Sequence, residues 1–370
     1  MSARKRVAAA DCPCHQSLPG ARSLIMEATD LRRIPSSDPL RAYRYRDGLY
    51  AADLVTAALV HLDFFTWLAA TPSDLAAICR HFAFAARPAD VMMTLFCANG
   101  FVTRAGEIFQ LSDSGRDFLL ASSPWSLAPY YRSLKDRPVT KDYLKVLSTG
   151  KPANWGGYDE SADWHRAMED EAFARQFTAA MDCRGVLMGP AMAQALDLAR
   201  FSRLLDIGGG SGIYACSLVA NHPQLSATVF DQFSVEKIAR TRIAELGYAD
   251  RVDVRAGDML KEELPGGYDL HLYSNVLHDW DLPEVRQLLA ASFRSLEPGG
   301  MLLIHDAFID ADKCGPLPVA EYSALLMHST QGKCYSTAEY EALATETGFR
   351  GFSFRTTAAD RGVMTAEKPS

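Results

Sequence analysis

Apolar and polar positions divide the chain into a helical first part and a second part in which strands and helices alternate. Residues 49–70 predict one long helix, because they are predominantly apolar and contain no helix-breaking Gly or Pro. Residues 71–74 read Thr-Pro-Ser-Asp, a turn and helix cap ahead of a second helix over 75–82. The apolar residues of that second helix share one face, and they are Leu75, Ile78, Cys79 and Phe82.

A third helix and a hairpin follow. The helix begins near Pro88 and stops near Gly100, and residues 101–104 and 107–111 are β-prone runs joined by a turn. This order predicts a winged-helix domain. Winged helices often bind DNA, but residues 88–103 contain no Lys or Arg, which contacts with phosphates and base edges require. We therefore expect the third helix to lie in the core or at a subunit interface.

The second part has the layout of a nucleotide-binding sheet. Residues 121–170 predict an irregular connector with exposed aromatic side chains, and a helical pattern resumes at 171. From about residue 190 the alternation predicts a Rossmann-like, doubly wound α/β fold, with a mostly parallel sheet and helices on both faces. The predicted strands are 203–208, 227–231, 251–258, 268–276, 299–308, 351–357 and 363–367.

These patterns divide the chain into three segments. We expect a poorly ordered tail over residues 1–40, a helical winged-helix domain with its connector over 41–189, and the α/β domain over 190–370.

Charge and hydropathy exclude several classes of partner. The net charge is -7 and the isoelectric point is near 5.7, so the chain lacks the clustered basic residues that attract nucleic acid or anionic membranes. The most apolar stretch, 54–70, is interrupted by His61 and Asp63 and falls short of the about 20 apolar residues of a membrane span. The basic N-terminus has no apolar segment typical of a secretory signal. We expect a cytoplasmic protein with neither a nucleic-acid nor a membrane partner.

The cysteines favour reduced thiols. All eight are scattered rather than regularly spaced, which suits a cytosolic enzyme better than a disulfide framework. Cys12, Cys14 and His15 crowd together, but no second ligand pair follows at the spacing of a zinc site. Their segment is rich in Ala, Ser, Pro and Arg, so we expect a mobile tail and no metal.

A glycine-rich loop follows the first strand of the predicted sheet. In LLDIGGGSG the glycines at 208, 209, 210 and 212 allow a tight turn and close approach of a ligand to the main chain. Ligands of doubly wound sheets bind at the carboxyl ends of the strands, at this switch point. Asp231 ends the next strand and is placed to accept hydrogen bonds from two ribose hydroxyls. The pattern predicts a nucleoside-containing cofactor.

The acids around this loop favour S-adenosylmethionine over NAD. Dinucleotide enzymes use G-x-G-x-x-G for a pyrophosphate, whereas here G-x-G-x-G follows an acid, which disfavours phosphate and suits an amino group. The third strand ends in Gly-Asp-Met, a carboxylate for an adenine amine and an apolar face for its ring. A lone glycine loop is a weak signal, but three successive strand ends carry acids. The predicted cofactor-binding residues are Asp206, Gly208, Gly210, Asp231, Gly257, Asp258 and Met259.

His278 follows the fourth strand and therefore belongs to the same row of loops. Position alone leaves a structural histidine equally open, but the chemistry favours a base. A phenol has a pKa near ~10, and its methylation at neutral pH is helped by a base that titrates near ~6.5. Asp306 ends the fifth strand and is a candidate to hold the other ring nitrogen.

Taken together, the glycine loop, F-D, G-D-M, L-H-D-W and P-G-G-M-L-L-I, behind a winged helix, closely resemble the small-molecule O-methyltransferases of the caffeate, hydroxyneurosporene and acetylserotonin type. The resemblance runs from about residue 45 to 360. It implies an intertwined homodimer formed through the N-terminal domain, S-adenosylmethionine held by the glycine loop, Asp231, Asp258 and Met259, and His278 as the base that deprotonates the acceptor hydroxyl. Phe177 and Met181 match an F-x-x-x-M pattern at the cofactor and substrate boundary, or else belong to a helix core.

Two positions depart from the plant members of this family. Ser274 stands where they have a lysine four residues before the histidine, so a charged cofactor contact becomes at most a hydrogen bond. Asp306 matches one of the two glutamates that hold the histidine, whereas Cys334 aligns with the other. Some relatives with a weakened base methylate by positioning alone, and a few use the cofactor for hydroxylation, decarboxylation or pericyclic chemistry.

We therefore predict a dimeric enzyme that transfers a methyl group from S-adenosylmethionine to a hydroxyl of a small, aromatic acceptor. Met327, His328 and the connector aromatics indicate a flat, apolar ring, although this composition also suits ordinary packing. Two alternatives remain: a nonmethylating protein of the same fold that uses bound S-adenosylmethionine, and a winged-helix regulator.

Overall fold

The computed structural model describes residues 29–153 and 171–370, and Leu31–Ser370 form one compact unit. The predicted cluster of Cys12, Cys14 and His15 lies outside the described residues. Part of the expected tail is ordered: Leu31 is fully buried, and its carbonyl accepts a hydrogen bond from the Asn221 side chain at 2.9 Å. An apolar side chain therefore anchors the chain nine residues before the first helix.

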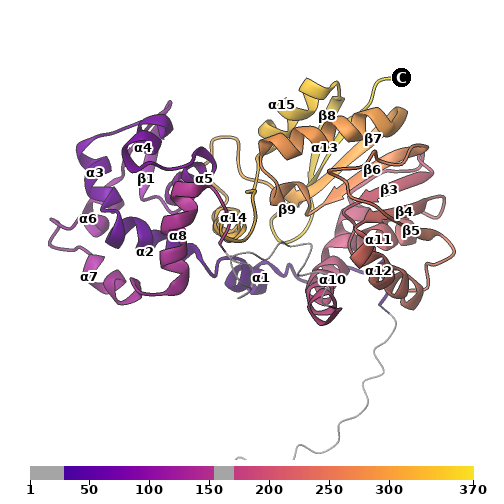
Figure 1. Cartoon of the computed structure of the whole chain (residues 1–370), viewed down its shortest axis with the longest axis horizontal. Coiled ribbons are helices and arrows are strands. Elements are labelled where there is room, and N and C mark those ends of the chain that lie inside the picture. The colour runs from indigo at the N-terminus through magenta and orange to yellow at the C-terminus, as the bar shows by residue number, and fades with distance from the viewer. Residues whose placement is uncertain (1–28, 154–170) are drawn as a thin grey trace, which may run out of the picture. The chain divides into compact units, whose positions relative to one another are not determined.

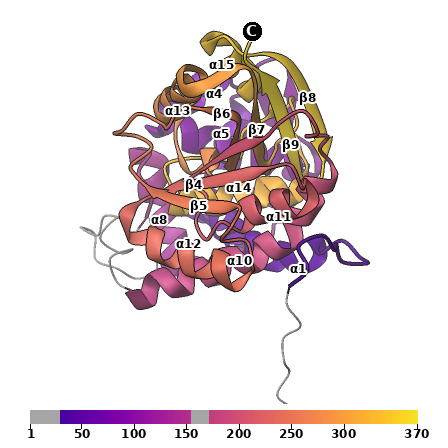
Figure 2. The same cartoon turned by 90° about the vertical axis from the view of Figure 1, so that its right-hand side faces the viewer.

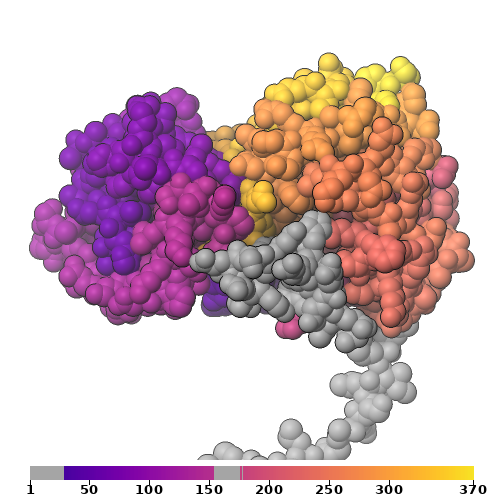
Figure 3. Space-filling view, viewed as in Figure 1, coloured from indigo at the N-terminus to yellow at the C-terminus, as the bar shows by residue number. Residues whose placement is uncertain are grey.

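The part before residue 150 is helical with one small hairpin (Figure 1). Its elements are α1 (Leu40–Asp47), α2 (Ala51–Thr56), the π-helical turn η1 (Ala57–His61), α3 (Phe64–Ala70), α4 (Leu75–Phe82), α5 (Ala86–Ala98), β1 (Val102–Ala105), β2 (Ile108–Leu111), α6 (Asp113–Leu119), α7 (Ala128–Tyr131), the turn η2 (Arg132–Leu134) and α8 (Pro138–Thr149). In the space-filling view, the side chains of α2 to α8 pack into one continuous body (Figure 3).

The winged-helix order is confirmed. Asp74 caps α4, where its carboxylate accepts a hydrogen bond from the Ala77 amide at 2.7 Å, and β1 pairs antiparallel with β2. The third helix is α5, and Met92 and Leu95 on it are fully buried, as expected of a core helix.

Two expectations for this part are wrong. The single helix over 49–70 is broken, because the π-helical turn ends at His61 and Asp63 takes a left-handed conformation with φ 48°. The connector after 121 contains the regular helix α8, which starts with Pro138 and buries Tyr143 completely. Trp125 and Tyr130 nearby are exposed, as predicted.

The second part is a seven-stranded sheet between two layers of helices. Its elements are α10 (Glu171–Gln194), β3 (Arg203–Ile207), α11 (Ile213–Asn221), β4 (Ser226–Asp231), α12 (Phe233–Glu245), β5 (Val252–Ala256), β6 (Tyr268–Ser274), the turn η3 (Leu277–Asp279), α13 (Leu282–Ser295), β7 (Leu296–Ala307), α14 (Leu317–Ser329), α15 (Thr337–Thr347), β8 (Arg350–Thr356) and β9 (Arg361–Glu367). The strand order is β5-β4-β3-β6-β7-β9-β8. Strand β9 runs in the opposite direction to the other six.

Alternating side chains explain the two helix layers. Leu204 and Leu303 pack in the cluster that contains α10, α11 and α12, whereas Leu205 and Leu302 pack in the cluster that contains α13 and α15. Successive strand residues point to opposite faces, so apolar strands without alternation require cover on both sides. Figures 1 and 2 show these helices on the two faces of the sheet. The predicted α/β fold is confirmed.

Helix α14 belongs to the second part in sequence but packs with the first. Met327 and Val319 on α14 are fully buried in the same apolar cluster as α2, α5 and α8. Within the described ranges, no single helix has the length and apolar content of a membrane span, and Ala51–His61 with Phe64–Ala70 meets that test only as a pair bent by 64°.

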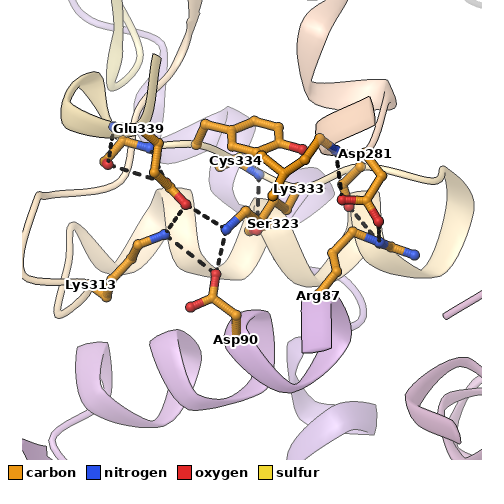
Figure 4. A network of polar contacts seen from close by, with 12 residues as sticks. Arg87, Asp90, Asp281, Lys313, Ser323, Lys333, Cys334 and Glu339 are labelled. Carbon is orange, nitrogen blue, oxygen red and sulfur yellow. Dashed lines mark hydrogen bonds and ion pairs between the residues drawn. The ribbon is translucent and has the colours of Figure 1, made fainter. Parts of the chain in front are cut away.

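A cluster of four charged side chains joins α5 to the segments on either side of α14 (Figure 4). The ammonium group of Lys333 is 2.5 Å from the Asp90 carboxylate and 2.7 Å from the Glu339 carboxylate, and Lys313 lies 2.7 Å from Glu339. The Lys333 side chain is only 9% exposed. Burial acts to raise the pKa of Glu339, but the two lysines outweigh it and lower that pKa to about 2. The pairs are therefore charged at neutral pH.

We expect Lys333→Met to lower the free energy of unfolding by about 2 kcal/mol, because it leaves two half-buried carboxylates with one cation. Urea denaturation at pH 7 measures this change. The control is Arg286→Met, which breaks the exposed Arg286–Glu346 pair and should cost less than about 1 kcal/mol. Equal stability of the two variants would contradict this account of the cluster.

Candidate active site

The carboxyl ends of five parallel strands bring most of the predicted site residues to one edge of the sheet. The register pairs Ile207 with Phe230 and Ser274 with His305, so the loops after β3 and β4, and those after β6 and β7, start side by side. This edge carries both the glycine loop and the His278 turn.

The glycine loop has the conformation that the sequence predicts. Gly208, Gly210 and Gly212 have φ values of 68°, 55° and 80°, which side chains with a Cβ rarely adopt. A Cβ at Gly208 would also lie 3.0 Å from the Val276 side chain. The Gly210 amide donates a hydrogen bond to the Asp231 carboxylate at 2.7 Å. The bare backbone and Asp231 therefore form one unit that fits a nucleoside with free hydroxyls.

A cavity of about 570 Å³ lies beside Asp231, at the ends of β4 and β5. Asp231 is half-buried, burial raises its pKa, and its other oxygen accepts from the Gln232 amide at 2.7 Å. Phe233 on the cavity wall is 83% exposed, an apolar face that an aromatic ring could cover. The cavity is lined by Gln232, Phe233, Ser234, Ala256, Gly257, Asp258 and Glu262.

Gly257 and Asp258, two of the predicted cofactor-binding residues, line this cavity. A Cβ at Gly257 would lie 2.3 Å from the Phe230 ring, so the strand end can approach β4 only without a side chain. The Asp258 carboxylate lies 2.9 Å from the Lys261 ammonium group and accepts a hydrogen bond from the Leu260 amide. Met259 is half-buried, and its sulfur would be 3.7 Å from a Cβ at Gly208.

Asp206 lies beneath the glycine loop rather than on its open side. It is fully buried, and a Cβ at Gly209 would lie 2.6 Å from its carboxyl carbon. Burial and then the charge of Asp231 raise the pKa of Asp206 to about 7, and the backbone N–H of Ala215 only partly opposes this rise. Within the described residues, neither Asp206 oxygen has a hydrogen-bond partner of ordinary geometry. An amino group of a ligand would satisfy them, provided that the loop opens.

Ser274 faces a buried network instead of open space. Its hydroxyl lies 2.9 Å from Nδ1 of His305 and accepts a hydrogen bond from the side-chain amide of Asn275 at 3.2 Å. Burial lowers the pKa of His305 to about 3, so this imidazole is neutral. Ser274 supports Asn275 in this arrangement.

His278 and Asp306 form a buried pair. Nδ1 of His278 lies 2.5 Å from the Asp306 carboxylate, and the two side chains are 4% and 1% exposed. A carboxylate only accepts hydrogen bonds, so Nδ1 carries the proton and Nε2 is left as the basic nitrogen. Nε2 is 3.6 Å from the Asp279 carboxylate, too far for a hydrogen bond.

The environment raises the pKa of His278. Burial acts to lower the pKa, but the negative charge of Asp306, followed by that of Asp279, outweighs burial, and the net direction is above 6.5. A histidine in this setting gains a proton readily, because the negative charge of Asp306 stabilises the imidazolium that forms. This is the behaviour of a general base.

The segment from 330 to 336 closes over the His278 turn. The Gln331 amide donates to the Asp279 carbonyl at 3.1 Å, and a Cβ at Gly332 would lie 2.0 Å from the His278 carbonyl oxygen. Cys334 in this segment is buried, and its amide donates to the Ser323 hydroxyl at 3.1 Å (Figure 4). Burial, followed by the charge of Asp306, holds the pKa of the Cys334 thiol well above its usual value, so this thiol is neutral.

The structure separates the predicted substrate residues. Met181 on α10 is half-buried and accepts a weak hydrogen bond from Arg184 at 3.4 Å, while Phe177 lies on the same helix and its side chain is outside the described residues. Met327 is fully buried in the apolar cluster of the helical part. His328 lies 3.4 Å from Asp142 and packs against Tyr50. The prediction of substrate contacts for Met327 and His328 is therefore not supported, because helical packing already covers both side chains.

Sequence reasoning missed a group of polar residues beside His278. The Arg184 guanidinium donates to the Asn275 side chain at 3.0 Å and to the Tyr322 hydroxyl at 3.3 Å, and the Tyr322 ring meets the His278 ring edge to face at 5.7 Å. Asn275 has a left-handed φ of 55° and donates to the Tyr214 hydroxyl at 3.0 Å. The sequence signal that could have indicated this group is an asparagine, a residue that tolerates the left-handed conformation, two positions before the L-H-D-W motif.

No group of three metal-ligating side chains occurs among residues 29–153 and 171–370.

Comparisons with known proteins point to one family. Residues 152–350 match the model of the O-methyltransferase domain. The chain is 30% identical over 297 residues to the 3-hydroxy-5-methyl-1-naphthoate 3-O-methyltransferase of Streptomyces sahachiroi. The aligned region covers 79% of this chain and 84% of that protein. It is 31% identical over 306 residues to the tetracenomycin polyketide synthesis 8-O-methyltransferase TcmO of Streptomyces glaucescens, with 81% and 87% covered.

Solved structures agree. An O-methyltransferase family 2 protein from Planctomyces limnophilus, in complex with apigenin, superposes with a TM-score of 0.83 at 30% identity, covering 93% of this chain and all of that one. Human N-acetylserotonin methyltransferase in complex with S-adenosylmethionine gives a TM-score of 0.58 at 25% identity, with 91% and 100% covered.

We expect Gly332→Ala to destabilise the protein by about 1 to 3 kcal/mol, because its Cβ would collide with the main chain of the His278 turn. Thermal and urea denaturation measure this cost. Gly266→Ala is the matched control, since a Cβ there meets nothing within 4 Å. A Gly332→Ala protein as stable as the control would show that the two segments are not packed as described.

Proposed function

The chain belongs to the S-adenosylmethionine-dependent O-methyltransferase family, and from that premise we propose that His278 is the general base that activates a hydroxyl of an aromatic acceptor. The observation that carries this role is the buried His278–Asp306 pair at the strand ends that also hold the glycine loop. Family membership favours methyl transfer over the nonmethylating alternative, and the helix without Lys or Arg argues against a DNA-binding regulator.

The residues at the strand ends fit the cofactor. Asp231 would hold the ribose, and the cavity wall at Gly257 and Asp258, followed in the chain by Met259, would hold the adenine. The Gly208 and Gly210 backbone would lie along the methionine part. Asp206 is buried, and neither of its oxygens has a hydrogen-bond partner of ordinary geometry among the described residues, so it would take the amino group after a movement of the loop. When bound, S-adenosylmethionine supplies an electrophilic methyl group.

His278 would act on the acceptor through Nε2. This nitrogen accepts the hydroxyl proton, and Asp306 holds the ring by the Nδ1 hydrogen bond and stabilises the imidazolium that forms. Orienting the deprotonated oxygen toward the methyl group then accounts for several kcal/mol of rate enhancement, on the scale of about 7 to 11 kcal/mol for well-oriented reactants.

We propose the acceptor class from the relatives. The relative from Streptomyces sahachiroi is named for a hydroxynaphthoate, and the Planctomyces structure contains apigenin. Both are hydroxylated aromatic rings. Tyr322 is only 2% exposed and belongs to the same apolar cluster as Met327, so we propose that it positions the His278 ring rather than contacts the acceptor.

We further propose a homodimer formed through the segment 41–189, with the catalytic part over 190–370. Exposed aromatic side chains such as Trp125 and Tyr130 on this segment support an interface, although α10 continues through Pro190 at the proposed boundary. The cysteines from 79 onward are free thiols, which supports a reducing compartment such as the cytoplasm.

The first test is binding and turnover. The protein should bind S-adenosylmethionine but not NAD in calorimetric titration, and it should form S-adenosylhomocysteine with hydroxylated aromatic acceptors. His278→Ala should bind the cofactor normally and lose about 100- to 10,000-fold in kcat. His81→Ala is the control on a histidine far from the motif. Unchanged kcat in His278→Ala would leave positioning alone as the source of catalysis.

The pH dependence of kcat/KM tests the role of Asp306. The base must be neutral to act, so kcat/KM should rise with pH through the pKa of His278, above 6.5. Asp306→Asn removes the charge that raises this pKa, while the burial that lowers it remains. The rising limb should therefore move to lower pH, and kcat should fall. A limb that stays in place would mean that Asp306 does not set the pKa of His278.

A further inference from the structure

Arg184 is a half-buried cation for which the described residues offer no carboxylate partner. Within residues 29–153 and 171–370, its guanidinium donates to three neutral groups: the Met181 sulfur, the Asn275 amide oxygen and the Tyr322 hydroxyl. Its Nε is buried and has no acceptor in the described part of the chain. Burial of a charge without a partner costs free energy, so such a group usually marks a site that a ligand completes.

The neighbouring arginine shows the contrast. Arg361 is 3% exposed and pairs with the Asp47 carboxylate at 2.8 Å. The Arg361 guanidinium lies 4.6 Å from the Tyr322 ring centroid, and that of Arg184 lies 5.8 Å from it. Both guanidinium groups thus lie against the Tyr322 ring, but among the described residues only Arg361 pairs with a carboxylate. The group has an excess positive charge.

The charge on Arg184 persists. Burial acts to lower its pKa, but Tyr322, Tyr214 and Asp47 outweigh this and raise the pKa above its ordinary value. The nearby His305 is neutral and adds no charge to either side.

Arg184 also lies between the two functional elements. Its helix, α10, packs on the start of α11, because Asp182 accepts a hydrogen bond from Ser211 and a Cβ at Gly185 would lie 2.2 Å from Ile213. Ser211 belongs to the glycine loop. On its other side, Arg184 reaches Tyr322, which contacts His278, and its charge acts to lower the pKa of His278. A ligand that spans the loop and the base would pass this guanidinium.

We propose that Arg184 is an anion-binding residue of the active site and that it pairs with a carboxylate of a bound reactant. A guanidinium presents planar N–H donors that match a carboxylate, and the free Nε donor is part of that fork. Two sources carry this group: the methionine part of the cofactor, and an acceptor in which a carboxylate sits near the hydroxyl. The inference rests on the proposed function, because it needs both reactants to bind at this edge.

Paired probes that differ only in the carboxylate test the proposal and separate the two sources. Calorimetric titration compares S-adenosylmethionine with its decarboxylated form, and 3-hydroxy-2-naphthoate with 2-naphthol in the presence of S-adenosylhomocysteine. In the unaltered protein, loss of the carboxylate should weaken binding by about 10- to 100-fold for the pair that Arg184 recognises. In Arg184→Met this ratio should fall to about 1, and Arg184→Lys should restore part of it.

Each outcome has one meaning. A ratio lost in the cofactor pair assigns Arg184 to the methionine carboxylate, and a ratio lost in the naphthalene pair assigns it to an acidic acceptor. Ratios that Arg184→Met leaves unchanged in both pairs overturn the proposal. Tyr322→Phe is the matched control: it removes the acceptor of one Arg184 hydrogen bond but keeps the charge, so both ratios should survive.

Folding and family function are checked separately. Circular dichroism and the urea midpoint establish that each variant is folded, and Arg184→Gln replaces Arg184→Met if the latter does not fold. Failure of the unaltered protein to bind S-adenosylmethionine would contradict the proposed function. Normal binding in the unaltered protein with no dependence on Arg184 would contradict only this inference.

Discussion

The hydrogen bond between Nδ1 of His278 and Asp306 is the interaction on which the site depends. It joins the turn after β6 to the end of β7, and it works because these neighbouring parallel strands end at the same edge. The bond fixes which ring nitrogen carries the proton. The negative charge of Asp306, followed by that of Asp279, outweighs the effect of burial and raises the pKa of His278. Both the orientation and the basicity of the imidazole therefore follow from the fold of the sheet.

The helical part contributes to this edge through the main chain of Gly332. Arg87 on α5 is buried and donates to the carbonyls of Gly332 at 2.6 Å and Gly150 at 2.5 Å, and its Nε lies 3.6 Å from Asp281, the cap of α13 (Figure 4). Gly332 in turn packs directly against the main chain of His278. The first part of the chain thus supports the His278 turn through Arg87 and Gly332, although it supplies neither His278 nor Asp306.

The sequence predicts local features well and side-chain partners poorly. The sheet, the winged helix, the glycine loop and the His278–Asp306 pair follow from periodicity and from the rule that strand ends meet at one edge. The break at Asp63 does not, because a left-handed residue inside an apolar run leaves no mark on periodicity. Arg184, Tyr322 and Arg361 come from three distant segments, and only the packed structure shows that two guanidinium groups lie against one phenol ring while, in the described part of the chain, only Arg361 pairs with a carboxylate.

Cys334 aligns with the second glutamate that holds the histidine in plant members of the family, and this difference affects the pKa of His278. A second carboxylate at this position would stand near Asp306, raise the pKa of His278 further and require its own desolvation. The buried thiol stays neutral, so Asp306 holds the ring nitrogen and the more distant Asp279 adds a smaller effect. Because Arg184 acts on His278 in the opposite direction, the pKa of the base is set by two carboxylates working against burial and one unpaired cation. Without a second carboxylate at this position, the pKa of His278 rises less than it would with one, and of the described residues Asp306 alone holds the ring.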